Sequence, residues 1–277
     1  MQRAFSRFIG VDLGGGRGKT TAVAELRIAA NGAAEVIEVA TRAGKLPWTD
    51  DTLIGRLAMP DPNRVIAVDA PLTQTACGRC KVEVCPGTES CIDPAVVWLR
   101  TAGRNMMMKV GVETVGGRTR TEQMPQARLA PYVHRATDVV MTYQRGLLPL
   151  SNLGTANSMI TARAGQLRRR LKGAGYTLHG NLLEVSPQAT IGALCGPRAA
   201  RGYKRDADPW VTRAQVLEKF DDLSFAPQSR MAREDVLRND HCFDAVIAAY
   251  TAYLWARDGW ELPTGVFAED GWIFSPP

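Results

Sequence analysis

Short apolar runs separated by turns limit the fold of this chain more than any other feature. FIGVDL and RVIAVDAP are continuous enough for buried strands, and they end near Asp12 and Asp69. The turn GGGRGK follows the first run, and then TTAVAELRIA and ANGAAEVIEVATRAG have the β-branched and apolar content of two further strands. We therefore expect three antiparallel strands, followed by a buried fourth strand that ends at Asp69.

The second half of the chain predicts helices and one more strand. Residues 157–172 place apolar side chains at helical spacing, with arginines away from that stripe. NLLEVSP is typical of a buried strand and carries Glu184. A last helix is expected to begin near Asn239 or Asp240 and to end before Gly259. This mixture of strands and helices indicates an α/β domain.

Composition and charge limit the class of protein. A chain of 277 residues with 45% hydrophobic and 22% charged residues can bury a substantial core, as folded globular proteins do. The formal net charge is +6, because Lys and Arg outnumber Asp and Glu by 34 to 28, which permits a polyanionic partner without requiring one. The apolar run at the amino end is too short for a secretory leader, and no run approaches the roughly 18 apolar residues of a membrane span. We expect a cytoplasmic protein.

Acidic side chains stand at the ends of the predicted strands. Asp12, Asp69 and Glu184 each end or lie within a buried run, where an unpaired charge is costly. Asp240 and Asp244 are four residues apart and therefore share a face of the last helix. Carboxylates that converge from several elements are suited to Mg²⁺ or Mn²⁺, which prefer oxygen ligands. The alternatives are that Asp240 is only a helix N-cap and that Asp244 pairs with an arginine.

The segment TACGRCKVEVCPGTESC holds four cysteines within fifteen residues. Their spacing, C-x2-C-x4-C-x5-C, predicts a structural or redox-active metal centre in one compact loop, formed by Cys77, Cys80, Cys85 and Cys91. Zn²⁺ takes four thiolates tetrahedrally, and a [4Fe–4S] cluster also takes four, so the spacing leaves both open. Four thiols without a metal are the remaining alternative.

The glycine turn is similar to a phosphate-binding loop, but its spacing argues against one. A phosphate loop has four residues between its first glycine and the Gly-Lys pair, whereas three residues separate Gly14 from Gly18. The segment that follows is also predicted as a strand, not as the helix whose N-terminus faces the phosphates. An NTPase of this class is therefore not expected.

Several segments together resemble a known family. They are IGVDLGGG, IAVDAPL, the stretch from GLLPLSNLG to LLEVSPQAT, and NDHCFDAVIAAYTAYLWARDGWELP with EDGWIFSP. In this order and spacing they are similar to the predicted nucleases of domain-of-unknown-function family 429, which are assigned an RNase H-like fold. The resemblance implies that Asp12 and Asp69 are the carboxylates of the first and fourth strands. It also makes Glu184 the acid of a Glu-x-aromatic-Pro pattern and Asp244 the aspartate of the terminal Asp-Ala helix.

Two positions and one long segment depart from the family pattern. Ser186 stands where an aromatic residue is usual, and His241 with Cys242 stands where a second acidic residue is common. Residues 73–150, which hold the cysteines, lie outside the resemblance and are predicted to be an insertion. The expected architecture is one RNase H-like α/β domain over residues 1–277, with a mixed sheet, flanking helices and a cysteine-rich metal-binding insertion.

These features predict a nuclease that hydrolyses phosphodiester bonds of DNA or RNA by a two-metal mechanism. One divalent ion activates a water in such a mechanism, and the other stabilises the leaving oxygen. The residues expected to hold the ions are Asp12, Asp69, Glu184, and Asp240 or Asp244. No nucleophilic side chain is required.

Basic residues indicate where a nucleic acid would lie. Contacts with its backbone are assigned to Lys19, Arg163, Arg168 and Arg169. A solvated helix face is the plainer interpretation of the arginines. Two other functions are compatible with the sequence: a nucleic-acid-binding or redox-sensing protein without hydrolytic activity, and a nucleotide-binding phosphotransferase.

Overall fold

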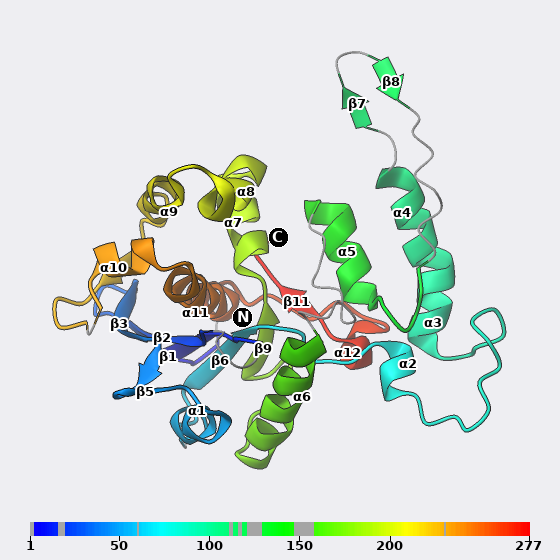
Figure 1. Ribbon diagram of the computed structural model, residues 1–277, viewed down its shortest axis with the longest axis horizontal. Coiled ribbons are helices and arrows are strands. Elements are labelled where there is room, and N and C mark those ends of the chain that lie inside the picture. Colours follow the sequence, from blue (N-terminus) through cyan, green and yellow to red (C-terminus); the bar gives the residue numbers. More distant parts are fainter. Residues whose placement is uncertain are drawn as a thin grey trace.

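The computed structural model has an α/β architecture, in which helices cover both faces of one seven-stranded sheet (Figure 1). It describes residues 3–15, 20–59, 61–110, 113–115, 118–120, 129–146, 158–229 and 231–277. No helix among these residues is long and apolar enough to cross a membrane.

The sheet mixes antiparallel and parallel strands in the order β10-β3-β2-β1-β6-β9-β11. Its strands are β1 (Arg7–Asp12), β2 (Ala22–Ile28), β3 (Ala34–Ala40), β6 (Arg64–Asp69), β9 (Leu182–Val185), β10 (Leu223–Phe225) and β11 (Ile273–Phe274). The first three form an antiparallel meander, and β6 then runs parallel to β1. The predicted antiparallel strands and the buried fourth strand are therefore confirmed.

Helix α11 (Asp240–Asp258) packs against one face of the sheet, and every residue from Cys242 to Ala256 is buried. It begins after the N-cap Asn239 and ends at Gly259, whose φ of 69° suits a glycine, so the predicted helix is confirmed. The close approach depends on Gly10 in β1, where a Cβ atom would lie 1.9 Å from the carbonyl oxygen of Ala245. The position of α11 on β1 is therefore tightly fixed.

The opposite face carries α1 (Asp50–Leu57) and α6 (Ser158–Gly173). Ala164, Leu167 and Leu171 of α6 are buried against the sheet, as their helical spacing predicts. The predicted helix is thus confirmed, and the sheet has a hydrophobic core on each face.

Four helices follow β9 in a part of the chain for which the sequence analysis assigned no element. They are α7 (Pro187–Cys195), α8 (Pro197–Arg205), α9 (Pro209–Glu218) and α10 (Arg233–Arg238). Each of the first three has a proline in its first turn, where the missing N–H costs nothing. These helices extend the layer that contains α11 (Figure 1).

Most of the remaining elements lie in the segment predicted as an insertion, residues 73–150. This segment holds α2 (Ala76–Arg79), α3 (Pro94–Trp98), a π-helical turn (Leu99–Gly103), α4 (Arg104–Val110), β7 (Glu113–Val115), β8 (Arg118–Arg120) and α5 (Ala136–Arg145). Elsewhere are β4 (Arg42–Ala43), β5 (Leu46–Pro47) and α12 (Phe267–Asp270). That residues 1–277 form one domain stays a prediction.

Candidate metal centre at the ends of two parallel strands

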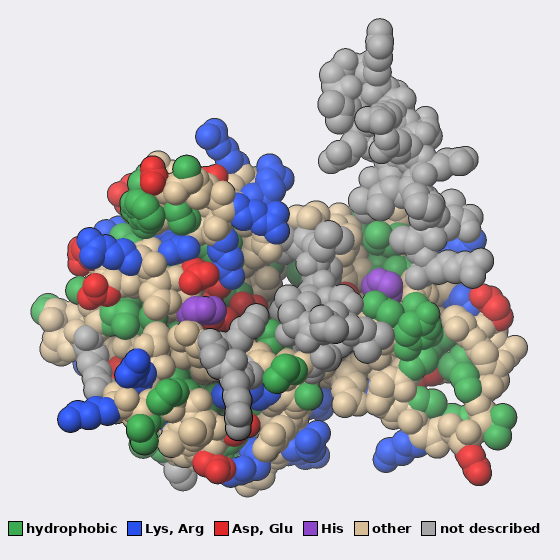
Figure 2. Space-filling view, in the orientation of Figure 1, with side chains coloured by type: hydrophobic (Ala, Val, Ile, Leu, Met, Phe, Trp, Pro, Cys, Tyr) green, Lys and Arg blue, Asp and Glu red, His purple; other side chains and the backbone are tan. Residues whose placement is uncertain are grey.

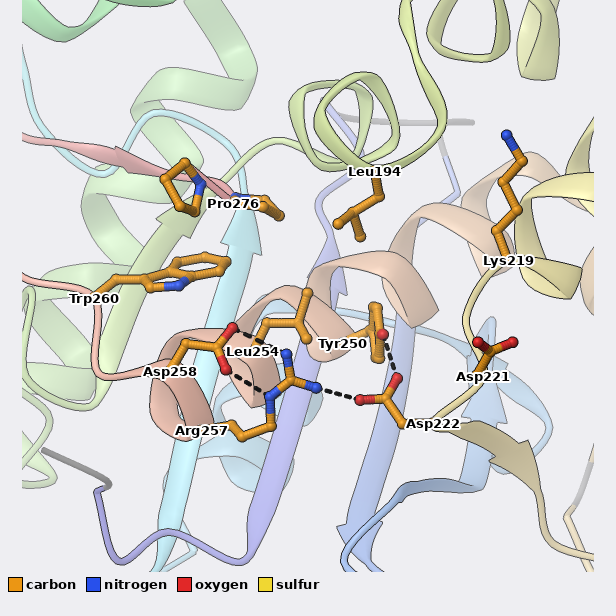
Figure 3. A pocket seen from close by; sticks show the side chains of 11 residues that line it. Leu194, Lys219, Asp221, Asp222, Tyr250, Leu254, Arg257, Asp258, Trp260 and Pro276 are labelled. Carbon is orange, nitrogen blue, oxygen red and sulfur yellow. Dashed lines mark hydrogen bonds and ion pairs between the residues drawn. The ribbon is translucent and has the colours of Figure 1, made fainter.

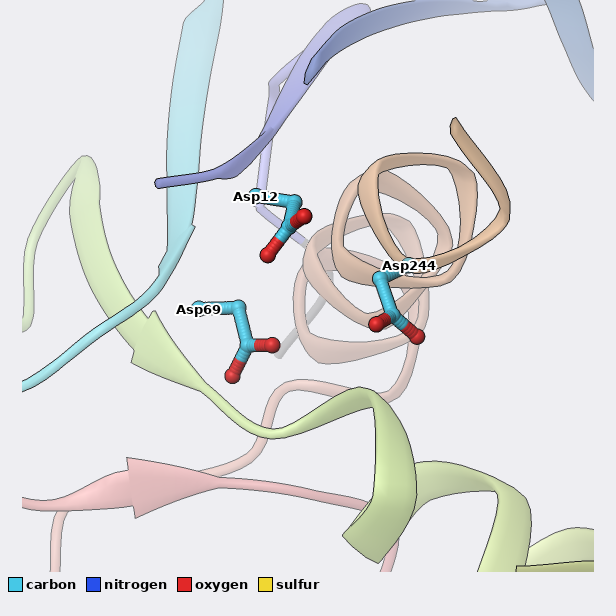
Figure 4. Close-up of side chains that lie close together, drawn as sticks. All are labelled: Asp12, Asp69 and Asp244. Atoms are coloured by element: carbon cyan, nitrogen blue, oxygen red, sulfur yellow. The ribbon is translucent and has the colours of Figure 1, made fainter. Parts of the chain in front are cut away.

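Three aspartates from distant parts of the chain meet at one end of the sheet (Figure 4). Asp12 and Asp69 are the last residues of β1 and β6, and they are paired in the parallel register of these strands. Asp244 reaches them from the second turn of α11. Each side chain offers one carboxylate oxygen, and the three oxygens lie within 4.8 Å of one another. Among the described His, Cys, Asp and Glu side chains, no other group of three meets this condition.

Burial and nearby negative charge raise the affinity for protons of two of these carboxylates, Asp69 and Asp244. Burial raises the pKa of Asp69 well above its usual value, and the negative charges of Asp244 and Asp12 raise it further. Burial also raises the pKa of Asp244 to about 6, although the ammonium group of Lys204 opposes the change. The three aspartates therefore form a site that gains free energy by taking up a proton or a cation.

Two basic side chains already contribute positive charge at the rim of this site. The Nζ atom of Lys204, on α8, lies 2.5 Å from Oδ2 of Asp244, and Nδ1 of His241 lies 2.5 Å from Oδ2 of Asp12. The side chains of Lys204 and His241 are 43% and 40% exposed. The hydrogen bond with Asp12 raises the pKa of His241, which favours the charged imidazolium. Because both cations reach solvent, they can move aside when another cation enters.

Glu184 lies outside the group of three aspartates and serves a different contact. Arg135 donates to both of its carboxylate oxygens, at 2.7 and 2.8 Å, and the backbone N–H of Leu72 donates to one of them. Arg135 also pairs with Asp138, with its Nη2 atom 2.7 Å from Oδ1 of that residue. Burial alone would lower the pKa of Arg135, but the carboxylates of Asp138 and Glu184 raise it well above its usual value. Both partners of the Arg135–Glu184 pair are almost completely buried, so breaking the pair would leave an uncompensated buried charge.

Two further residues, Asp240 and Lys19, were predicted to contribute to the site at the strand ends. Asp240 is the first residue of α11, and its carboxylate is not part of the converging group. The N-cap of α11 is the preceding residue, Asn239, which accepts from the backbone N–H of Cys242. Lys19 lies outside the described residues.

The arginines of α6 are largely engaged within the protein. Arg163 pairs with Asp50 at 2.6 Å and also donates to the carbonyl oxygen of Gly14 at 2.6 Å. Arg168 donates to the carbonyl oxygen of Leu72 at 3.0 Å, which fixes the chain just after β6. Arg169 is exposed. These contacts leave Arg169 as the most available of the three arginines assigned to nucleic acid.

The cysteine loop joins α2 to α3 and extends away from the sheet (Figure 1). Cys77, Cys80 and Cys85 are exposed, Cys91 is half-buried, and all are free thiols. No three of the four sulfur atoms lie within 4.8 Å of one another. Burial raises the pKa of Cys77, and the other three thiols raise it further, so the four are close enough to interact electrostatically. The thiols are thus mostly exposed and do not converge on one point.

A separate open hollow lies at the other end of α11 (Figure 3). Three of its charged side chains pair among themselves, because Arg257 bonds to Asp222 and Asp258, and the Tyr250 hydroxyl also donates to Asp222. These groups are thus already bound to one another, and the aspartate site is the better functional candidate.

The sequence analysis missed Lys204 and the contact between His241 and Asp12. The only available signal was His241 itself, a basic residue at a position where the family commonly has an acid. A family model described as "Protein of unknown function (DUF429)" matches residues 10–266. Comparison with curated proteins gave no match. Comparison with solved structures gave none either.

Proposed function

The chain belongs to the DUF429 family, and from its converging aspartates we propose that it is a divalent-metal-dependent nuclease. The observation that carries the proposal is the meeting of Asp12, Asp69 and Asp244, with ligand oxygens within 4.8 Å of one another. The sheet order and mixed strand directions are compatible with the RNase H-like fold that the family resemblance implies. Carboxylates from three elements, held by paired strands and a buried helix, are typical of a functional site.

The aspartate site fits Mg²⁺ or Mn²⁺ by its donor atoms and by its charge. Both are hard cations that take oxygen ligands, and the site offers three carboxylates with raised pKa values at Asp69 and Asp244. When bound, such ions supply a Lewis acid and an activated water for attack on a phosphodiester. Asp12, Asp69 and Asp244 would hold the ions, while Glu184 would act indirectly, by anchoring the chain that follows β6 through Leu72.

The basic residues at the rim would have roles of their own. Lys204, on the surface beside Asp244, is placed to meet a phosphate oxygen once it leaves that carboxylate. The hydrogen bond with Asp12 raises the pKa of His241, and an imidazolium at this position would help to neutralise the site before substrate enters. The aspartates of this site would otherwise repel a polyanionic substrate.

Hydrolysis of labelled DNA and RNA, with Mg²⁺ or Mn²⁺ and with EDTA, tests the proposal. We expect cleavage only with metal, and its loss in Asp12→Asn and in Asp69→Asn. Asp221→Asn is the matched control, because it removes one exposed carboxylate at the other end of α11. Cleavage that persists in EDTA or in Asp69→Asn would contradict the metal-dependent mechanism.

A second function is favoured by the ion pairs at the rim. Lys204 and His241 already neutralise two of the three aspartates, so the site is also compatible with nucleic-acid binding or redox sensing without hydrolysis. Tight binding of labelled nucleic acid without cleavage would support this candidate. Tight binding of ATP in the same assay would instead support a nucleotide-binding phosphotransferase.

We propose separately that the cysteine loop binds either a [4Fe–4S] cluster or Zn²⁺. The thiols have the number and softness of ligand that both require, and their mutual electrostatic interaction supports a shared site. The backbone N–H of Val82 donates to Sγ of Cys80 at 3.4 Å. Binding would require the loop to close, because the sulfurs are not yet within ligand distance of one point.

Metal analysis of anaerobically purified protein tests the cysteine proposal. Iron and sulfide with a broad absorption near 400 nm would identify a cluster, and one equivalent of zinc in colourless protein would identify Zn²⁺. Cys85→Ser should lower the metal content, whereas Cys195→Ser, outside the loop, should not. Protein without either metal would show that the four thiols are unligated.

A further inference from the structure

Helix α8 presents a row of basic side chains beside the aspartate site. Ala200, Gly202 and Tyr203 face inward and are buried. The exposed basic residues of this helix are Arg198, Arg201, Lys204 and Arg205. Figure 2 shows Lys and Arg side chains gathered over this helix. A helix of nine residues with this distribution has one apolar face and one strongly positive face.

The arginines of α8 are not used to hold the fold together. Within the described residues, Arg198, Arg201 and Arg205 make no ion pair and no hydrogen bond through their side chains. The contrast with α6 is clear, since Arg163 and Arg168 both bind partners inside the protein. Side chains of α8 are therefore available to a partner from outside.

The basic face begins at the aspartate site itself. Lys204 pairs with Asp244, and the neighbouring Tyr203 packs against Phe243 with ring centroids 5.8 Å apart. The amide nitrogen of Gln188 donates to the carbonyl oxygen of Ala200 at 3.0 Å, which ties α8 to α7. These contacts fix the position of α8, so its charges are held at the edge of the site.

The spacing of the arginines matches a nucleic-acid backbone. Arg198, Arg201 and Arg205 are at positions i, i+3 and i+7, which share one side of a helix. At a rise of about 1.5 Å per residue, they span about 10 Å along the axis. One strand of a duplex carries a phosphate for about every 3.4 Å of axis, so this row covers about three successive phosphates.

We propose that α8 is the surface that binds the phosphate backbone and presents a nucleic-acid strand to the aspartates. The inference rests on the proposed nuclease function and names its substrate class: a strand several nucleotides long, not a mononucleotide or a small phosphoester. Binding by arginine to phosphate is independent of base sequence and weakens with salt. The strand would run along α8 and reach the three aspartates next to Lys204.

The test compares two triple variants that remove the same charge from different parts of the surface. The first replaces Arg198, Arg201 and Arg205 of α8 by alanine, and the matched control replaces three exposed basic residues outside α8, Arg27, Lys172 and Lys219. Binding of a fluorescent 20-nucleotide strand and a 20-base-pair duplex is measured by anisotropy in EDTA, from 50 to 300 mM KCl. Circular dichroism confirms that each variant is folded.

We expect the α8 triple to weaken binding at least tenfold at 100 mM KCl. The slope of log affinity against log salt should fall by about 2 to 3, because each lost phosphate contact contributes about 0.9 for duplex DNA. The control triple should change affinity less than about threefold. Equal effects of the two triples, or an unchanged slope in the α8 triple, would overturn the proposal.

The design separates failure of this surface from failure of the nuclease. Binding is measured without metal, so it does not depend on hydrolysis. If the α8 triple binds normally and the wild-type protein hydrolyses the substrate, the proposed nuclease function is supported and the role of α8 is refuted. If the α8 triple loses binding and no form of the protein hydrolyses the substrate, the role of α8 in binding is supported and the nuclease function is not. Binding of vesicles with anionic lipid, but not of nucleic acid, would also overturn the proposal.

Discussion

Replacement of Asp244 by asparagine should make the metal-free protein more stable. The carboxyl group is almost completely buried, and its pKa is raised to about 6 from an ordinary value of 3.8. A raised pKa means that ionisation is harder in the folded state, so the folded state is penalised increasingly as the pH rises above 3.8, and fully above about 6. Asparagine has nearly the same shape and cannot ionise.

The expected magnitude follows from the shift of about two pKa units. At about 1.4 kcal/mol per unit, the ionised carboxylate lowers the free energy of unfolding by about 3 kcal/mol at pH 7.5, where Asp244 is ionised in both the folded and the unfolded state. The penalty falls to about half of that value at pH 5 and below about 1 kcal/mol at pH 4, because the folded state then keeps its proton. The Asn variant should therefore gain most stability at pH 7.5 and little at pH 4.

Urea denaturation in EDTA at pH 7.5, 5 and 4 measures this gain. Asp221→Asn, which removes an exposed charge at the other end of α11, should change stability by less than about 0.5 kcal/mol at each pH. Added Mg²⁺ should stabilise the wild-type protein, by about 2.7 kcal/mol at a concentration 100 times the Kd, and should stabilise Asp244→Asn much less. An Asn variant that is less stable than the wild type at pH 7.5 would refute the electrostatic reasoning.

Two further predictions concern the elements that position the site, and both are measured by urea denaturation. Gly10→Ala should lower the free energy of unfolding by at least about 3 kcal/mol, because the new methyl group meets the backbone of α11. Gly55→Ala, with open space around it, should be neutral or slightly stabilising. Equal effects of the two variants would contradict the close approach of β1 and α11. Arg135→Met should lower the free energy of unfolding by about 3 to 5 kcal/mol, because it leaves the buried carboxylate of Glu184 without its charged partner. A loss below about 1 kcal/mol would show that the pair is not essential to the fold.

Much of the sheet was predictable because its signals are local. The runs that became β1, β2, β3, β6 and β9 are apolar and β-branched over a few residues, and α6 and α11 show a helical period. The sequence also indicated that Asp12 and Asp69 stand at strand ends and could converge, and the parallel pairing of β1 with β6, seen only in the structure, explains how they meet. Local sequence patterns were sufficient to predict a residue's place wherever that place depends only on the strand or helix that contains the residue.

The partners of the acids were not predictable, because they come from distant segments. Lys204 lies 40 positions before Asp244, and Arg135 lies 49 positions before Glu184. A strand pattern shows that Glu184 is buried, but it does not show which cation compensates the buried charge. That is why the sequence placed Glu184 with the aspartates, whereas the structure places it against an arginine.

Both edges of the sheet consist of very short strands, three residues in β10 and two in β11. Unpaired N–H and C=O groups on a long edge strand recruit strands from other molecules and begin aggregation. These two edges offer few such groups, so addition of a foreign strand gains few hydrogen bonds at either side. We infer that the sheet is protected against edge-to-edge self-association by the brevity of its outermost strands.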